Sequence, residues 1–197
     1  MFVRILIAGI VGGILVFVMG AVNHMVLGLQ GRTMSSIANE PTFIEHLKGR
    51  NLKPGLYSFP EVPANAAEQD QAKVYAEVNE RYKAGPAGLL LIAPTGEDMM
   101  GAKTLGLEWA TDTLAALLVA WIVSLMASDV SFVRRWIAVV AIGGVAWLSL
   151  TASYGIWYRF PHAFVDDELY CVLLEWGVAG LAIAAIARRP PAVIATK

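Results

Sequence analysis

The stretch Ile5–Leu29, ILIAGIVGGILVFVMGAVNHMVLGL, decides the fold of this chain. Its 25 residues include no Asp, Glu, Lys or Arg. A helix rises about 1.5 Å per residue, so a helix of this length covers more than the roughly 30 Å hydrocarbon core of a bilayer. The run is too long for the apolar region of a signal peptide, and Ala21-Val22-Asn23-His24 offers no small-x-small cleavage site. The stretch therefore predicts an uncleaved transmembrane helix.

Small residues and one titratable residue share a single face of this predicted helix. At 100° per residue, Gly13, Gly20 and His24 lie about 40°, 20° and 60° around the helix from Gly9. Small residues let neighbouring helices approach closely, and an imidazole in lipid would lack hydrogen-bond partners. This face therefore predicts companion helices within the membrane. The residues expected at helix contacts are Gly9, Gly13, Gly20, Gly144 and Ala179.

The composition agrees with a small membrane protein that crosses the bilayer several times. The 197 residues are 57% hydrophobic and 16% charged, and the mean hydropathy is +0.58. The formal net charge of −1 provides no basic surface of the kind that nucleic acids require, so nucleic acid is not expected as a partner. The single cysteine, Cys171, lies in an apolar run and cannot form an internal disulfide.

Three further apolar stretches, Leu107–Ala127, Trp136–Tyr158 and Leu169–Ala187, predict three more spans. We therefore expect an all-α membrane protein built as a four-transmembrane-helix bundle. Most basic residues near the span ends gather on one side, and the positive-inside rule then predicts that both termini are cytoplasmic. The basic residues on that side are Arg4, Arg134, Arg135, Arg188, Arg189 and Lys197.

The polar region between the first and second spans is predicted to form a small α+β extracytoplasmic cap. Leu56–Phe59 and Gly88–Ala93 are each bounded by Gly and Pro, and they predict two short strands that can pair. Between them, Ala66–Ala84 carries apolar residues at helical spacing. The predicted divisions of the chain are residues 1–29 as the first transmembrane helix, residues 30–106 as the cap, and residues 107–197 as helices two to four with a cytoplasmic tail.

Polar residues inside the predicted spans are the candidates for chemistry. His24 lies near the extracytoplasmic end of the first span, Glu108 and Asp112 lie near that end of the second, and Glu175 lies about two turns into the fourth. Because all four are predicted at similar depth, we expect His24 to meet at least one of the carboxylates. Imidazole and carboxylates together suit several divalent metal ions. A divalent metal is therefore the candidate cofactor, with these four residues as its ligands.

Three interpretations of this cluster stay open. The side chains can form hydrogen bonds between helices without a ligand, they can bind a metal ion or relay protons, or they can contact a lipid or a quinone. No HxxxH, ExxH or CxxC pair favours the metal. In the predicted outer loop before the fourth span, His162 is expected to form a surface ion pair with one of the acidic residues Asp166, Asp167 and Glu168.

Four sequence motifs carry a resemblance to a known family. They are Gly12-Gly13 with Phe17 and Asn23-His24-Met25 in the first span, GLYSFP at 55–60, GPAGLL at 85–90 and WYRFP at 157–161. The chain resembles a family of uncharacterised bacterial four-span inner-membrane proteins of unknown function. The resemblance implies the four-span architecture and a bacterial inner membrane, and it assigns no functional residue.

From the sequence we expect a non-enzymatic integral membrane protein that serves as an accessory or structural subunit of a larger membrane complex. Its partners would be the lipid bilayer and either other membrane subunits or a second copy. The sequence contains neither a nucleotide-binding motif nor the broken helix pair used by many transporters. The alternatives are a metal-, haem- or quinone-binding membrane protein that uses the His24 cluster, and a small-solute transporter.

Overall fold

The computed structural model describes residues 1–63, 65, 70–96 and 98–188, and it divides into two compact units. Met1–Ser35 and Asp98–Lys197 form a helical unit, and Ser36–Glu97 form a smaller α/β unit. The chain is mostly helical, as the sequence predicts. The helical unit also includes residues 30–35 and 98–106, which hydropathy alone assigns to the cap.

Four helices in the described part of the chain are long and apolar enough to cross a membrane. This confirms the four predicted spans at the level of length and composition. The helices begin before the predicted spans, because backbone hydrogen bonds continue through charged residues where an apolar run stops. They are α1 (Phe2–Ala21) with the π-helical turn η1 (Val22–Val26), α4 (Ala102–Ser124), α5 (Phe132–Ser149) with α6 (Thr151–Trp157), and α7 (His162–Ile186).

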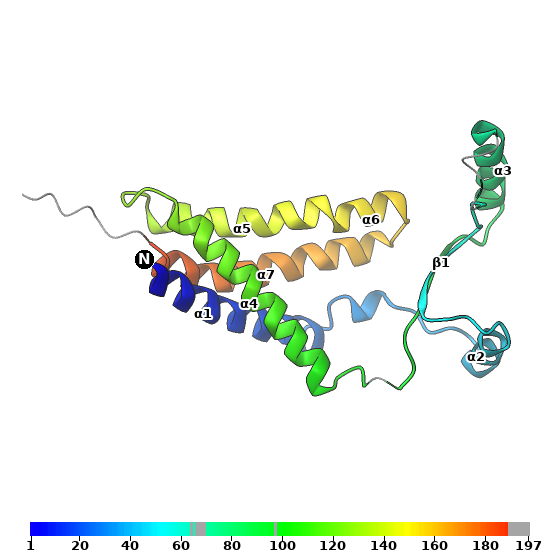
Figure 1. Cartoon of the computed structure of the whole chain (residues 1–197), viewed down its shortest axis with the longest axis horizontal. Helices are drawn as coiled ribbons and strands as arrows, with labels where there is room; N and C mark the ends of the chain where they lie inside the picture. Colours follow the sequence, from blue (N-terminus) through cyan, green and yellow to red (C-terminus); the bar gives the residue numbers. More distant parts are fainter. Residues whose placement is uncertain (64, 66–69, 97, 189–197) are drawn as a thin grey trace, which may run out of the picture. The chain divides into compact units, whose positions relative to one another are not determined.

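The helices pack in the order α4, α1, α7, α5 (Figure 1). Helix α1 packs against both α4 and α7, α7 packs against both α1 and α5, and α4 crosses the others obliquely. The main cluster of buried apolar residues lies toward one end of the unit, which we call the closed half. Its buried residues are Ala8 and Val16 of α1, Ala116, Val119, Ala120 and Val123 of α4, Val139 of α5, and Ala179, Ile183 and Ala187 in and just after α7.

Glycines permit the close approach of α1 and α4 in the closed half. A Cβ atom added at Gly13 would lie 2.4 Å from the Cα atom of Thr113, and one added at Gly9 would lie 2.8 Å from the Cα atom of Leu117. Both distances are far inside ordinary contact, so only glycine fits against the α4 backbone here. At Gly20 the nearest atom to an added Cβ is Glu175 Oε1 at 3.6 Å, so this position is not tightly packed.

The glycine of α5 that packs against α7 is Gly143, one residue before the predicted Gly144. A Cβ atom added at Gly143 would lie 2.8 Å from the ring of Trp176, whereas one added at Gly144 would meet nothing within 4 Å. A shift of one residue turns a side chain by 100° around a helix, so hydropathy alone does not separate the two glycines. Ala179 is fully buried in the core, on the face of α7 where the sequence places it.

Side-chain hydrogen bonds to backbone carbonyls also attach α5 to α7. Trp136 Nε1 donates to the carbonyl of Gly177 at 2.9 Å, and Arg135 Nε donates to the carbonyl of Ala184 at 2.9 Å. The Arg135 residue is only 6% exposed. Its charge lies near the C-terminal end of α7, where the helix dipole favours a cation. Arg135 is therefore a structural residue of the closed half.

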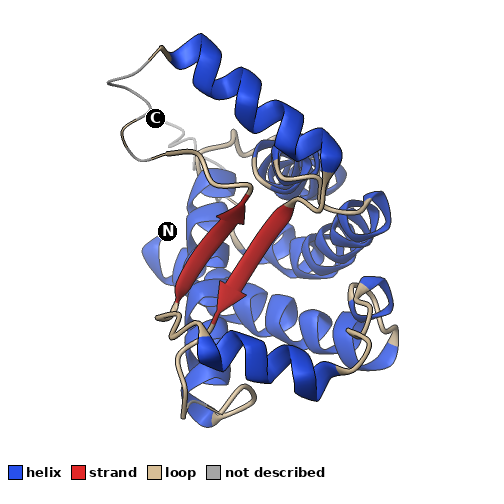
Figure 2. Cartoon of the chain, turned by 90° about the vertical axis from the view of Figure 1, so that its right-hand side faces the viewer, coloured by secondary structure: helices blue, strands red, loops and turns tan. Residues whose placement is uncertain are grey.

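The α/β unit contains α2 (Glu40–Gly49), β1 (Gly55–Phe59), α3 (Gln71–Ala84) and β2 (Gly88–Ile92). The strands pair antiparallel with Tyr57 opposite Leu90, which confirms the predicted strand pair (Figure 2). Helix α3 begins after Asp70, whose side chain accepts from the backbone N–H of Lys73 at 3.3 Å. The predicted helical residues 66–69 lie outside the described part of the chain.

Candidate functional site

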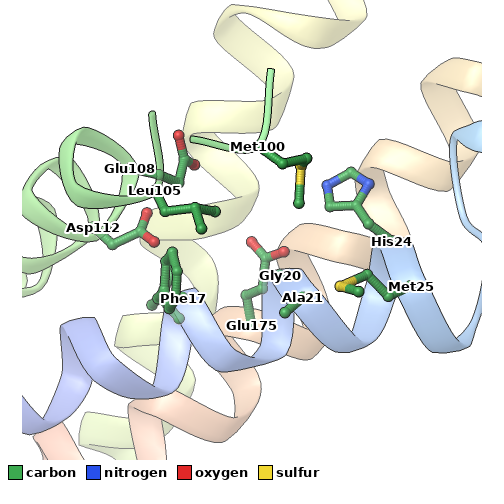
Figure 3. A pocket seen from close by; sticks show the side chains of 11 residues that line it. Phe17, Gly20, Ala21, His24, Met25, Met100, Leu105, Glu108, Asp112 and Glu175 are labelled. Atoms are coloured by element: carbon green, nitrogen blue, oxygen red, sulfur yellow. The ribbon is translucent and has the colours of Figure 1, made fainter. Parts of the chain in front are cut away.

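A cavity of about 380 Å³ lies among α1, α4 and α7, adjoining the closed half at Val16. We call it the carboxylate cavity. All four residues of the predicted cluster line it: His24, Glu108, Asp112 and Glu175 (Figure 3). The remaining walls are apolar or small and come from Val16, Phe17, Gly20, Ala21, Met25, Met100 and Leu105. The fold therefore brings residues from distant parts of the sequence to one site.

The divergence of α4 from α1 creates this space. In the closed half, glycines hold the two helices together, and α4 buries Ala116, Val119, Ala120 and Val123. From Ala102 to Thr111, by contrast, every residue of α4 is exposed. Glycine contacts at one end of the crossing thus leave a gap at the other. Glu108 and Asp112 lie four residues apart, so they share one face of α4 and both reach the gap.

Glu175 projects into the cavity and is held by Asn23. Asn23 is fully buried, and its Nδ2 donates to Glu175 Oε1 at 2.9 Å and to the carbonyl of Cys171 at 3.4 Å. Asn23 belongs to the π-helical turn η1, in which the backbone N–H of Leu27 bonds to the carbonyl of Val22. Such turns shift the phase of a helix and are frequent at functional sites.

Asn23, and not the predicted His24, is the residue of the first span that bonds to a carboxylate of the cluster. On a regular helix, Asn23 lies about 100° from His24 and about 20° from Gly12, where an added Cβ atom would meet Ile183 of α7 at 2.8 Å. Asn23 therefore faces α7, and it lies within the π-helical turn η1. His24 is exposed at the cavity and makes neither a hydrogen bond nor an ion pair within the described part of the chain. The sequence signal for this contact is Asn23 itself, a polar residue next to His24 inside an apolar span.

The four predicted ligands surround the cavity without converging on one point. Among the described residues, no group of three or more His, Cys, Asp or Glu side chains is arranged so that it could hold a metal ion. Metal sites require ligand atoms about 2.0–2.6 Å from one centre. The metal interpretation stays a prediction, and the geometry suits a larger cation better than it suits a bare ion.

A second polar group connects the segment after α1 to α7. Arg32 Nε donates to Asp167 Oδ2 at 2.8 Å, a second guanidinium nitrogen bonds to the other carboxylate oxygen, and the backbone N–H of Gln30 donates to Oδ2 at 3.1 Å. The Gln30 side chain also bonds to Glu168. The Asp167 carboxylate raises the pKa of the Arg32 guanidinium above its ordinary value, through a hydrogen bond and charge attraction.

This arrangement corrects the expectation for the region before the fourth span. Asp167 lies on α7 and is 1% exposed, so it is neither in a loop nor on the surface. Its partner is Arg32 rather than His162, which begins α7. A cavity of about 460 Å³ adjoins the pair, lined partly by Tyr170. The sequence contains no local signal for a partner 135 residues away.

Comparison of the sequence with protein-family models and curated proteins, and of the structure with solved structures, finds no match. Function therefore has to be argued from the site itself.

Proposed function

We propose that this chain is a non-enzymatic integral membrane protein that acts as an accessory or structural subunit of a larger membrane complex. One observation supports the proposal most directly. The least apolar of the four candidate spans is α4, and its first half, Ala102–Thr111, is exposed along its whole length. A partly polar helix whose side chains are exposed gains more from protein neighbours than from lipid.

The face of α4 directed away from the carboxylate cavity has the features of a helix contact. Ala102, Gly106 and Ala110 recur every four residues and form one narrow stripe. A Cβ atom added at Gly106 would meet no described atom within 4 Å, so no described residue packs closely against this glycine. Small residues in membrane helices permit the close approach of another helix. We infer that a helix of another membrane subunit occupies this stripe.

The charge distribution supports a proposed orientation in a bacterial inner membrane. Arg4, Arg134 and Arg188 belong to the same end of the helical unit, where α1 begins, α4 connects to α5 and α7 ends. By the positive-inside rule, both termini would be cytoplasmic, and the segment between α1 and α4, within the predicted cap at residues 30–106, would be extracytoplasmic. The carboxylate cavity would then lie in the outer leaflet, and the α/β unit would be exported.

The subunit proposal is tested by purification from native membranes in a mild uncharged detergent, with size-exclusion chromatography and light scattering. We expect wild-type protein to elute in a complex larger than its own monomer. Gly106→Leu should remove the partner because the added side chain fills the stripe. Ala185→Leu is the matched control, since Ala185 is an exposed residue of α7. A wild-type monomer without companions, or a Gly106→Leu variant that keeps the complex, would contradict the proposal.

A further inference from the structure

We propose that the carboxylate cavity binds a lipophilic organic cation, meaning an amine or quaternary ammonium group attached to an apolar tail. This inference does not depend on the α4 partner. Glu108 and Asp112 lie about 120–160° around α4 from Gly106, so the cavity and the small-residue stripe use different faces of the helix.

The size of the cavity favours a small ligand. Small-molecule pockets span roughly 300–1,000 Å³, and a volume of about 380 Å³ lies near the lower end of that range. The cavity therefore suits a charged head group with a short apolar portion better than a large planar cofactor. It is also open to its surroundings, because lining residues such as Ala21, Met25 and Leu105 are exposed.

The charge of the cavity selects the sign of the ligand. Three carboxylates line it, against one imidazole, and no Lys or Arg is among the lining residues that the structure describes. Asn23 occupies one oxygen of Glu175, and Figure 3 shows the Glu175 carboxylate pointing into the space between α4 and η1. An anion would be repelled there, and a neutral ligand would leave the carboxylates uncompensated in an apolar setting.

The apolar walls select an organic cation over a metal ion. Carboxylates spread around the cavity, without three ligands at one centre in the described residues, match a charge distributed over a bulky group. Phe17 provides an aromatic ring, and rings attract alkylammonium groups through their faces. Met25 and Met100 add flexible, polarisable surface that adapts to an apolar tail. Apolar and aromatic walls beside carboxylates therefore match the tail and the charged group of a lipophilic cation.

The test uses two amphiphiles with the same tail and opposite charge, octyltrimethylammonium and octyl sulfate. Full-length protein in dodecyl maltoside is titrated with each below its micelle concentration, and binding is measured by isothermal titration calorimetry. We expect saturable binding of octyltrimethylammonium at least about tenfold tighter than that of octyl sulfate, a difference of about 1.4 kcal/mol. Equal affinity for the two amphiphiles would overturn the proposal.

Variants locate the binding within the cavity. Glu175→Gln and Asp112→Asn should each weaken octyltrimethylammonium binding about tenfold, and the Gln side chain can still accept the bond from Asn23 Nδ2. Ala21→Phe should block the cavity without changing its charge. Asp129→Asn, at an exposed site in the connection between α4 and α5, should bind like wild type. If all three cavity variants keep wild-type affinity, the site is elsewhere and the proposal is wrong.

These outcomes are separable from those of the subunit proposal. Failure to find a companion subunit leaves the titration unaffected, because it uses the purified chain alone. Thermal unfolding of each variant shows whether it is folded. If Glu175→Gln does not fold, Ala21→Phe and Glu108→Gln decide the result, since Ala21 and Glu108 are exposed lining residues without a structural bond from their side chains in the described part of the chain.

Discussion

Gly13→Ala tests the packing of α1 against α4 with a single methyl group. The added carbon would lie 2.4 Å from the Cα atom of Thr113, about 1 Å inside the shortest ordinary contact. Because the obstacle is backbone, α4 has to move as a whole. A gap of 0.5–1 Å forfeits about a quarter to a half of each dispersion contact along the interface, and overpacking of this kind costs about 1–3 kcal/mol.

The assay is thermal unfolding of purified protein in dodecyl maltoside, followed by tryptophan fluorescence. For a chain of this size, 1 kcal/mol corresponds to roughly 2–4 °C in Tm, so a cost of about 1–3 kcal/mol should lower the Tm of Gly13→Ala by roughly 2–12 °C. Gly20→Ala is the matched control, because its Cβ atom would meet only Glu175 Oε1 at 3.6 Å. Both substitutions gain the same helix propensity, so their difference reports the contact alone. A Gly13→Ala variant as stable as Gly20→Ala would refute the packing described for α1 and α4.

Two further predictions concern the connection to α7 and the orientation in the membrane. Asp167→Asn should destabilise the protein by about 1–3 kcal/mol in thermal unfolding, because it removes the charge that pairs with Arg32. Asp166→Asn, at an exposed position, is the control and should have little effect. Equal losses of stability in the two variants would argue against the pair. Reporter fusions should place a site after Arg135 in the cytoplasm and one near Asp70 outside it. A cytoplasmic signal near Asp70 would reverse the proposed orientation.

The spans and the strand pair were predictable because their signals are local. An uncharged run such as Ile5–Leu29 marks a helix by its length, and Gly and Pro mark the ends of β1 and β2. The start of α7 was not predictable from local sequence. The acidic residues that follow Pro161 are typical of a loop, and the ion pair of Asp167 with the distant residue Arg32 has no local signal. The long-range ion pair between Arg32 and Asp167 compensates the buried charge in this part of α7.

The candidate site was predictable in its membership and unpredictable in its connections. Depth along the helices was enough to group His24, Glu108, Asp112 and Glu175, because depth follows from residue number in a straight helix. Orientation depends on helical phase, and Asn23 lies at nearly the same phase as Gly12, which faces Ile183 of α7. Phase therefore decides that Asn23 contacts Glu175, while His24 remains exposed at the cavity.

The position of glycine along α1 explains why a packed core and a cavity coexist in one small unit. Gly9 and Gly13 bring α4 into backbone contact, whereas Gly20 meets only the end of the Glu175 side chain. Two straight helices that touch at one point and cross obliquely must separate away from that point. The carboxylates of α4 lie on the diverging part, so they line a space instead of a contact. The glycine contacts that stabilise the closed half thereby create the carboxylate cavity.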